Sequence, residues 1–112
     1  MNLKYTPKAK EDLLRIRESI IEDFEDEEIS KKVLREITKT ARNLTAFPYM
    51  GKKVSEFTDV FTKYRVIFCK KNYIFYRIED DTILVIRILN EKQDYMQILF
   101  GISEVEEADD EG

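Results

Sequence analysis

The sequence contains no histidine, a single cysteine and only three glycines. Without histidine it cannot form a serine–histidine–aspartate triad, a histidine general base or a metal site with histidine ligands. The glycines lie far apart, so no glycine-rich loop can cradle a nucleotide phosphate. Cys69 has no disulfide partner and falls within an expected strand, which favours a buried structural thiol. These absences exclude much of enzyme catalysis, and we expect no metal ion, no cofactor and a reducing, cytoplasmic compartment.

The sequence also lacks a hydrophobic run long enough to cross a membrane, which takes roughly 18 residues. The opening MNLKYTPKAK has no apolar stretch typical of a secretory signal. The 112 residues suit one domain, and six tyrosines and seven phenylalanines are enough to build one core. We therefore expect a single soluble domain without a membrane partner.

Charge is distributed unevenly along the chain, although the net charge is only -4. Residues 1–28 carry five basic and nine acidic side chains, whereas residues 29–102 carry fourteen basic and eight acidic ones. Residues 103–112 hold six acidic side chains, no basic one and no apolar periodicity. This division predicts a slightly basic folded domain over residues 1–102, followed by an acidic, solvated or disordered tail over residues 103–112.

Two amphipathic helices are predicted in the first half of the chain. Thr6 and Pro7 are typical of a helix start, because threonine caps the free N–H groups and proline lacks one. Apolar residues then recur every three or four positions up to about residue 26: Ala9, Leu13, Ile16, Ile20 and Phe24. The acidic run 25–28 interrupts this pattern, and we expect Ser30 to cap a second helix that ends before FPYMG at 47–51. The two helices should form a hairpin.

Strands are predicted at the N-terminus and in the second half. The opening LKY can form a short strand, and three runs are rich in β-branched and aromatic residues: 64–69, 73–79 and 82–89. Their short separations require antiparallel hairpins, with turns expected at Lys71-Asn72 and Asp80-Asp81. Strict alternation then places seven residues on one sheet face: Arg65, Ile67, Ile74, Tyr76, Ile78, Val85 and Arg87. With a short helical turn in DYMQILFG, this predicts an α+β domain whose helices lie on one side of an antiparallel sheet.

Basic and tyrosine residues are interleaved through the predicted sheet and its loops. The set could bind RNA phosphates and stack bases, or it could form a solvated sheet edge that lysines protect against pairing. Composition alone leaves both interpretations open. The residues are Lys52, Lys53, Lys63, Arg65, Lys70, Lys71, Arg77, Arg87 and Lys92, with Tyr64, Tyr73, Tyr76 and Tyr95.

Four segments, in this order, resemble the RelE/ParE toxin superfamily: KYTPKAKEDLLRI, LTAFPYMG, KYRVIFCKKNYIFYRIEDDTILVIRIL and NEKQDYMQILF. They span nearly all of residues 2–101. The resemblance implies an N-terminal strand and a helical hairpin packed on a curved antiparallel sheet. It also implies the toxin of a type II toxin-antitoxin system, linked to growth inhibition and plasmid stabilization. A cognate antitoxin would wrap the toxin with a helix and an extended segment and neutralise it.

The superfamily contains two kinds of toxin, and the resemblance alone does not choose between them. ParE-like members inhibit DNA gyrase, whereas RelE-like members are metal-independent endonucleases that cleave mRNA on the translating ribosome. The nucleases use basic residues on the sheet and often a tyrosine near the C-terminus, and here the candidates are Arg65, Lys92 and Tyr95. Ile67 and Ile74 occupy positions that are basic in the best-studied nucleases. This depleted basic set favours gyrase inhibition, with an endonuclease or a toxin fold that has lost activity as alternatives.

Four residues are expected to bind the target or the antitoxin: Arg65, Tyr76, Arg87 and Lys92. Arg65 could contact a phosphate or form an ion pair with the antitoxin. Arg87 could line a functional groove or tether the C-terminal segment through Asp94. Lys92 could be a target-binding cation or a solvated loop lysine, and the ring of Tyr95 could stack a base or pack beneath the last segment.

Overall fold

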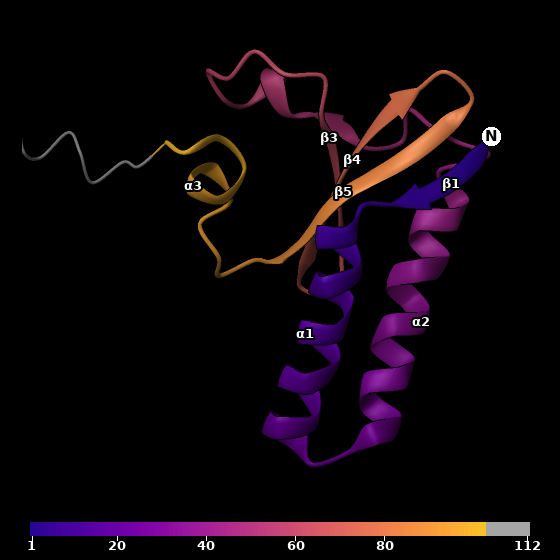
Figure 1. Cartoon of the computed structure of the whole chain (residues 1–112), viewed down its shortest axis with the longest axis vertical. Coiled ribbons are helices and arrows are strands. Elements are labelled where there is room, and N and C mark those ends of the chain that lie inside the picture. The colour runs from indigo at the N-terminus through magenta and orange to yellow at the C-terminus, as the bar shows by residue number, and fades with distance from the viewer. Residues whose placement is uncertain (103–112) are drawn as a thin grey trace, which may run out of the picture.

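The computed structural model describes residues 1–102, so the predicted acidic tail lies outside the described residues. Figure 1 shows the α1–α2 hairpin beneath the sheet, with α3 to one side and away from the hairpin. This is the α+β architecture expected from the sequence. The elements in order are β1 (Asn2–Tyr5), α1 (Pro7–Phe24), α2 (Glu27–Asn43), β2 (Lys52–Lys53), the 3-10 helix η1 (Val54–Glu56), β3 (Arg65–Cys69), β4 (Asn72–Glu79), β5 (Thr82–Asn90) and α3 (Tyr95–Phe100).

The five strands form one sheet in the order β1-β5-β4-β3-β2. The strands β3, β4 and β5 pair antiparallel, as expected, and the short strand β2, which was not predicted, pairs antiparallel with β3. In contrast, β1 pairs parallel with β5 and places Tyr5 opposite Val85. No hairpin turn links β1 to β5, so nothing in the local sequence imposes an antiparallel direction. The sheet is therefore mixed, with β1 as one edge and β2 as the other.

Thr6 begins α1 and also attaches it to the sheet. Its Oγ1 accepts a hydrogen bond from the Ala9 N–H at 3.0 Å and donates one to the Ile86 carbonyl at 2.7 Å. Pro7 occupies the first turn, where its missing N–H costs nothing. The predicted start of this helix is confirmed. In residues 1–102, no helix combines the length and the apolar character that crossing a membrane requires.

The second helix begins earlier than predicted. Asp26 caps it, because its carboxylate accepts a hydrogen bond from the Glu28 N–H at 2.8 Å. Ser30 lies inside the first turn, fully buried, and its hydroxyl donates to the Glu27 carbonyl at 2.7 Å. The prediction that Ser30 caps α2 is therefore wrong, since the acidic run supplies a cap of its own.

The first hairpin turn also lies one residue earlier than expected. Lys70 and Lys71 both have positive φ, at 49° and 65°, and Cys69 pairs with Asn72. The two lysines therefore form the two-residue turn, in the backbone conformation that the twist of a hairpin favours. The turn at Asp80-Asp81 is confirmed.

A β-bulge in β5 reverses the expected alternation. Val85 lies opposite Tyr76, whereas Arg87 lies opposite Phe75, so Ile86 is an extra residue in β5. The prediction that Arg87 shares a face with Val85 is wrong for this reason. The strict alternation assumed from the sequence holds only up to the bulge.

Both faces of the sheet are packed. The face that meets α1 and α2 carries Ile74, Val85 and Ile88 against the helix residues Ala9, Ile16, Ile37 and Ala41. The opposite face carries Phe75 and Leu89, which pack with Val54 and with Tyr95, Leu99 and Phe100 of α3. The helical hairpin and α3 thus lie on opposite sides of the sheet.

A buried carboxylate joins α1 to β5 beyond the end of β1. Asp12 accepts hydrogen bonds from the Ile88 N–H at 2.8 Å, from Nε and Nη2 of Arg87 at 2.8 and 3.0 Å, and from Nη1 of Arg15 at 2.8 Å. Its side chain is only 1% exposed. Burial alone would raise the pKa of Asp12, but the hydrogen bonds from Arg87, Ile88 and Arg15 together hold that pKa below its ordinary value.

The Asp12→Asn substitution should lower the free energy of unfolding by roughly 3–5 kcal/mol near neutral pH, because the Arg87 guanidinium would lose its carboxylate partner. Urea denaturation followed by circular dichroism measures the change. The control Glu18→Gln removes an exposed carboxylate from the same helix and should change stability by less than about 0.5 kcal/mol.

The wild type and the Asp12→Asn variant also test the lowered pKa of Asp12. The ionised form of Asp12 stabilises the fold fully above its unfolded pKa of about 3.9, and this contribution is lost as the pH falls through the lower folded pKa. The gap in stability between the wild type and Asp12→Asn should therefore narrow in acid. A gap of the same size at neutral pH and at about pH 2 would contradict this account.

Candidate functional site

Arg65 is held by the loop that follows α2. Its Nη1 donates a hydrogen bond to the Gly51 carbonyl at 2.8 Å, and its guanidinium carbon lies 4.9 Å from the centre of the Tyr49 ring. No carboxylate of residues 1–102 forms a salt bridge with it. Arg65 therefore supports this loop and still carries an unneutralised positive charge.

Tyr76 was expected to bind the target or the antitoxin, but its side chain is fully buried. Its hydroxyl accepts a hydrogen bond from the Gly51 N–H at 2.9 Å and donates one to the Pro48 carbonyl at 2.8 Å. A Cβ at Gly51 would lie 2.6 Å from that hydroxyl oxygen and 2.8 Å from the Val66 carbonyl, so the site requires glycine. Burial raises the pKa of Tyr76, although the Gly51 N–H and the Arg65 charge oppose this. Tyr76 thus holds the loop beneath Arg65 as a neutral phenol, out of a partner's reach.

Arg87 is the partner of Asp12, and within residues 1–102 no salt bridge joins it to Asp94. Asp94, the alternative partner, instead caps α3 by accepting a hydrogen bond from the Gln97 N–H at 3.2 Å. The interpretation in which Arg87 tethers that segment through Asp94 is therefore wrong. The hydrogen bond to Asp12 is also the main reason why the pKa of Arg87 is raised.

The remaining candidates, Lys92 and Tyr95, lie at the start of the C-terminal segment. Lys92 is exposed in the turn between β5 and α3, where its N–H donates to Asn90 Oδ1 at 2.9 Å. The Tyr95 ring packs on Tyr73 and Phe75, with ring centres 5.7 and 5.4 Å apart. Tyr95 therefore anchors α3 on the sheet, as the structural alternative predicted.

The three catalytic candidates do not form one cluster. Arg65 lies opposite Tyr76 in the sheet, on the face that packs against the helices. Tyr95 packs on Phe75, which lies opposite Val66 on the other face. The sheet itself therefore separates the Arg65 guanidinium from the Tyr95 ring.

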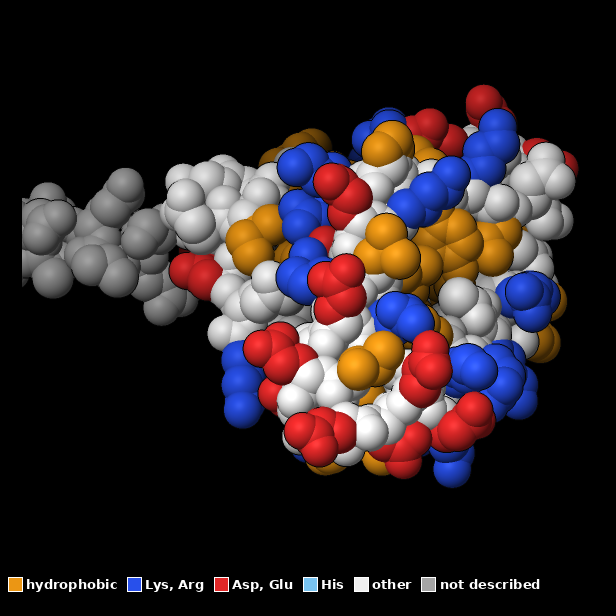
Figure 2. Space-filling model, turned by 60° about the horizontal axis from the view of Figure 1, so that its bottom comes forward, with side chains coloured by type: hydrophobic (Ala, Val, Ile, Leu, Met, Phe, Trp, Pro, Cys, Tyr) orange, Lys and Arg blue, Asp and Glu red, His pale blue; other side chains and the backbone are white. Residues whose placement is uncertain are grey.

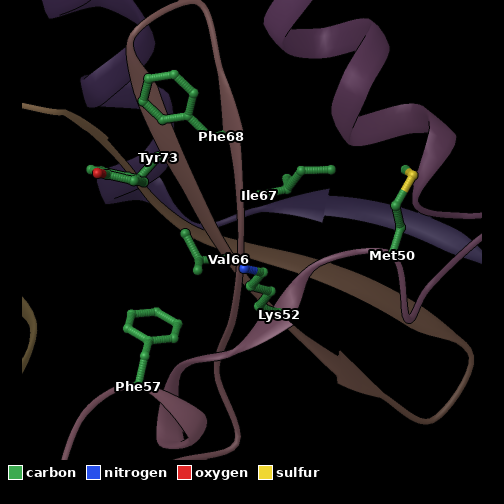
Figure 3. A pocket seen from close by; sticks show the side chains of 7 residues that line it. All are labelled: Met50, Lys52, Phe57, Val66, Ile67, Phe68 and Tyr73. Atoms are coloured by element: carbon green, nitrogen blue, oxygen red, sulfur yellow. The ribbon is translucent and has the colours of Figure 1, made fainter.

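An apolar groove of about 410 Å³ runs along the outer edge of β3. Figure 3 shows Phe57, Phe68 and Tyr73 on one side of the strand, with Lys52 near its middle. Because β2 pairs only with Arg65 and Val66, no other strand of residues 1–102 covers the edge from Ile67 to Cys69. The groove is lined by Met50, Lys52, Phe57, Val66, Ile67, Phe68 and Tyr73.

Large apolar side chains are exposed in this groove and on the loops before and after β2. Tyr49 is 69% exposed and Phe61 is fully exposed, although aromatic side chains usually supply a core. Phe57 and Phe68 are each about half exposed. Sequence reasoning missed this surface, because the apolar content of these loops looks the same whether it is buried or exposed. Exposed apolar side chains gathered at one place are typical of a protein-binding surface.

Charged side chains cover the helical hairpin. Figure 2 looks onto its end, where acidic side chains gather around the turn between α1 and α2 and basic side chains lie on both sides of that end. The exposed basic residues of α2 are Lys31, Lys32, Arg35, Lys39 and Arg42.

The structure offers little for metal or thiol chemistry. Within residues 1–102, no three Cys, Asp or Glu side chains lie close enough together to hold a metal ion. The Cys69 thiol is partly buried, and its sulfur accepts a hydrogen bond from the Thr40 hydroxyl at 3.3 Å. It has the packed, hydrogen-bonded surroundings of a structural thiol.

Comparison with known proteins gives one family. The family model described as the ParE toxin of the type II toxin-antitoxin system, parDE, matches residues 3–95. A solved structure described as the chromosomal ParDE TA system from P. aeruginosa is similar in fold, with a TM-score of 0.67 and 22% sequence identity. The similarity covers 80% of this chain and 95% of that chain. No curated protein sequence matches.

The Tyr76→Phe substitution should lower the free energy of unfolding by about 1–3 kcal/mol, because the buried Gly51 N–H would lose its acceptor. Tyr49→Phe is the control, since Tyr49 is exposed and the phenylalanine would keep a ring over Arg65. Its effect should stay within about 0.5 kcal/mol in the same urea titration. Equal effects of the two substitutions would contradict the proposed bracing of the loop.

Proposed function

Since the chain belongs to the ParE family of toxins from type II toxin-antitoxin systems, we propose that it arrests bacterial growth by binding DNA gyrase. We propose further that a cognate antitoxin neutralises it. The observation that carries the gyrase proposal is the separation of Arg65 from Tyr95 by the sheet. Inhibition by contact needs only a binding surface, whereas RNA cleavage needs several groups around one phosphate.

The arrangement of side chains argues against an efficient endonuclease. A metal-free nuclease must activate the 2'-hydroxyl and stabilise the phosphate charge with groups that reach the same atoms. Here Arg65 is bound to the Gly51 carbonyl, and Ile74 is fully buried where the nucleases have a basic residue. Lys92 is the one candidate that stays exposed with its ammonium in no salt bridge to residues 1–102. Lys92 alone cannot both activate the 2'-hydroxyl and stabilise the phosphate charge.

The groove along β3 is suited to protein contacts. Three aromatic side chains line it, Phe57, Phe68 and Tyr73, and aromatic residues are enriched in protein interfaces. The uncovered edge from Ile67 to Cys69 offers backbone groups to which an extended segment can add as a further strand. We assign this edge and groove to the extended segment of the antitoxin.

An endonuclease of RelE type is the second candidate, and the exposure of Lys92 next to α3 favours it. A toxin fold that has lost activity is the third. These three functions predict different outcomes when the chain is produced in a bacterial host.

Induction of the chain alone should change plasmid supercoiling and leave abundant messages intact, and Lys92→Gln should behave in the same way. Plasmid topoisomers and primer extension on abundant messages can be measured from one culture. Lys8→Gln, at another exposed lysine, is the matched control. New cleavages within translated codons that Lys92→Gln abolishes would establish the endonuclease instead. The absence of any growth defect would show that this copy is not toxic.

Binding of the antitoxin should depend on the groove. Phe68→Glu should weaken the affinity for the cognate antitoxin by at least about tenfold, because it places a charge in an apolar contact. Isothermal titration calorimetry with the two purified proteins measures this. Phe24→Glu makes the same change at another exposed phenylalanine, at the end of α1, and should leave the affinity within about threefold. Equal affinities for the wild type and Phe68→Glu would show that the antitoxin does not bind in this groove.

A further inference from the structure

The face of α1 that points away from the sheet carries a row of carboxylates. Glu11 and Glu18 each follow a buried residue, Ala9 and Ile16, by two positions. Two positions turn a helix by about 200°, so both carboxylates lie on the side opposite to the core. Glu22 continues the row one turn further along. All three are exposed, no salt bridge of residues 1–102 involves them, and we call them the acidic stripe.

The corresponding face of α2 carries a row of basic side chains. Lys32 and Lys39 follow the fully buried Ser30 and Ile37 by two positions each, and Arg35 lies between them on the same side. These three residues are exposed as well. None of them forms a salt bridge with another residue of the described chain, and we call them the basic stripe.

The two stripes cover the same stretch of the hairpin. Figure 1 shows α1 and α2 alongside each other. Since α1 ends at Phe24 and α2 begins at Glu27, residues whose numbers add up to about 24 + 27 = 51 lie at the same height. Glu11 is then level with about residue 40 and Glu18 with about residue 33.

Two arginines that flank the acidic stripe are already paired. Arg15 binds Asp12, and Arg17 binds Glu27 across the two helices. No salt bridge in the described part of the chain joins one stripe to the other, because the side chains of both leave the hairpin in the same direction. Opposite charges therefore lie next to each other on the outer face and are available to a partner.

We propose that two copies of this chain pair through the outer face of the hairpin, with α1 of each copy lying antiparallel on α2 of the other. A two-fold axis parallel to the helices produces this arrangement and uses the same surface of both copies. It sets each acidic stripe on the basic stripe of the second copy, with Glu11 near Lys39 and Glu18 near Arg35. A two-fold axis across the helices would instead set α1 on α1, and the like charges would repel.

The size of this face indicates a weak dimer. The 18 residues of α1 span about 27 Å, and two helices of about 10 Å diameter make a face of roughly 500 Å². A standard interface buries about 800 Å² per partner. Leu14, which is 61% exposed and lies between Glu11 and Glu18 on the same side, adds apolar contact near the middle. Charge therefore supplies most of the specificity, and salt should dissociate the pair.

The pairing leaves the groove along β3 free, because the outer face of the hairpin is turned away from the sheet. A dimer of this kind would present two grooves at once. This surface goes beyond the proposed function and does not depend on which target the toxin inhibits.

Sedimentation equilibrium of the full chain tests the pairing. Between about 10 and 300 µM, at about 20 mM salt, the average mass should rise toward twice that of one chain, and about 0.5 M salt should weaken the association at least about tenfold. Reversal of the basic stripe, by Lys32→Glu, Arg35→Glu and Lys39→Glu, should leave only monomer. The control Lys52→Glu, Lys53→Glu and Lys63→Glu has the same net charge and should still dimerise.

A charge swap tests which stripes meet. Reversal of the acidic stripe, by Glu11→Lys, Glu18→Lys and Glu22→Lys, should also give a monomer. Mixing this variant with the reversed basic stripe should restore a one-to-one dimer, because each stripe then faces its opposite again. Recovery on mixing also shows that both variants are folded.

Four results would overturn the proposal. These are a wild type that is monomeric throughout at low salt, a dimer that survives reversal of either stripe, loss of the dimer in the control as well, and no dimer in the mixture. If the wild type stays monomeric while reversal of the basic stripe weakens binding of the cognate antitoxin, the stripes serve the antitoxin instead.

Discussion

The buried carboxylate of Asp12 is the interaction on which the rest of the structure depends. It binds Arg87 and the Ile88 N–H just beyond the end of β1, where β5 would otherwise have a free edge inside the fold. This contact fixes α1 along β5. Together with α2, α1 then packs on one face of the sheet. The other face is left to α3 and to the loops after α2, which is where the groove along β3 lies.

Elements that depend on local chemistry could be predicted from the sequence. The Thr6 cap, the three strands of the meander and the short α3 are of this kind. The start of α2 could not be predicted, because Asp26 and Ser30 are both good caps and only burial of Ser30 in the packed hairpin separates them. The parallel pairing of β1 with β5 joins segments about eighty residues apart, so no local pattern specifies it. The bulge at Ile86 lies between the neighbouring strands β4 and β5, and the Ile86 carbonyl accepts a hydrogen bond from Thr6, eighty residues earlier in the chain.

The candidate site was harder to predict than the fold, for the same reason. Which face a strand residue occupies depends on register, and the bulge at Ile86 places Arg87 on the face opposite to the one predicted. Tyr76 and Arg87 are of residue types common in binding sites, yet the structure uses both internally, one to hold a loop and one to neutralise Asp12. The exposed groove depends on the path that the long loops take over the sheet, and composition does not encode that path.

What remains on the surface is an apolar groove, lined also by Lys52, beside an uncovered strand edge, and these features are suited to binding proteins. We therefore expect inhibition by contact, and the most direct measurement is supercoiling of relaxed plasmid by purified DNA gyrase in the presence of the purified chain. Micromolar chain should inhibit supercoiling in wild type and in Lys92→Gln alike. Full gyrase activity at that concentration, together with cleavage of ribosome-bound mRNA by the same preparation, would contradict it.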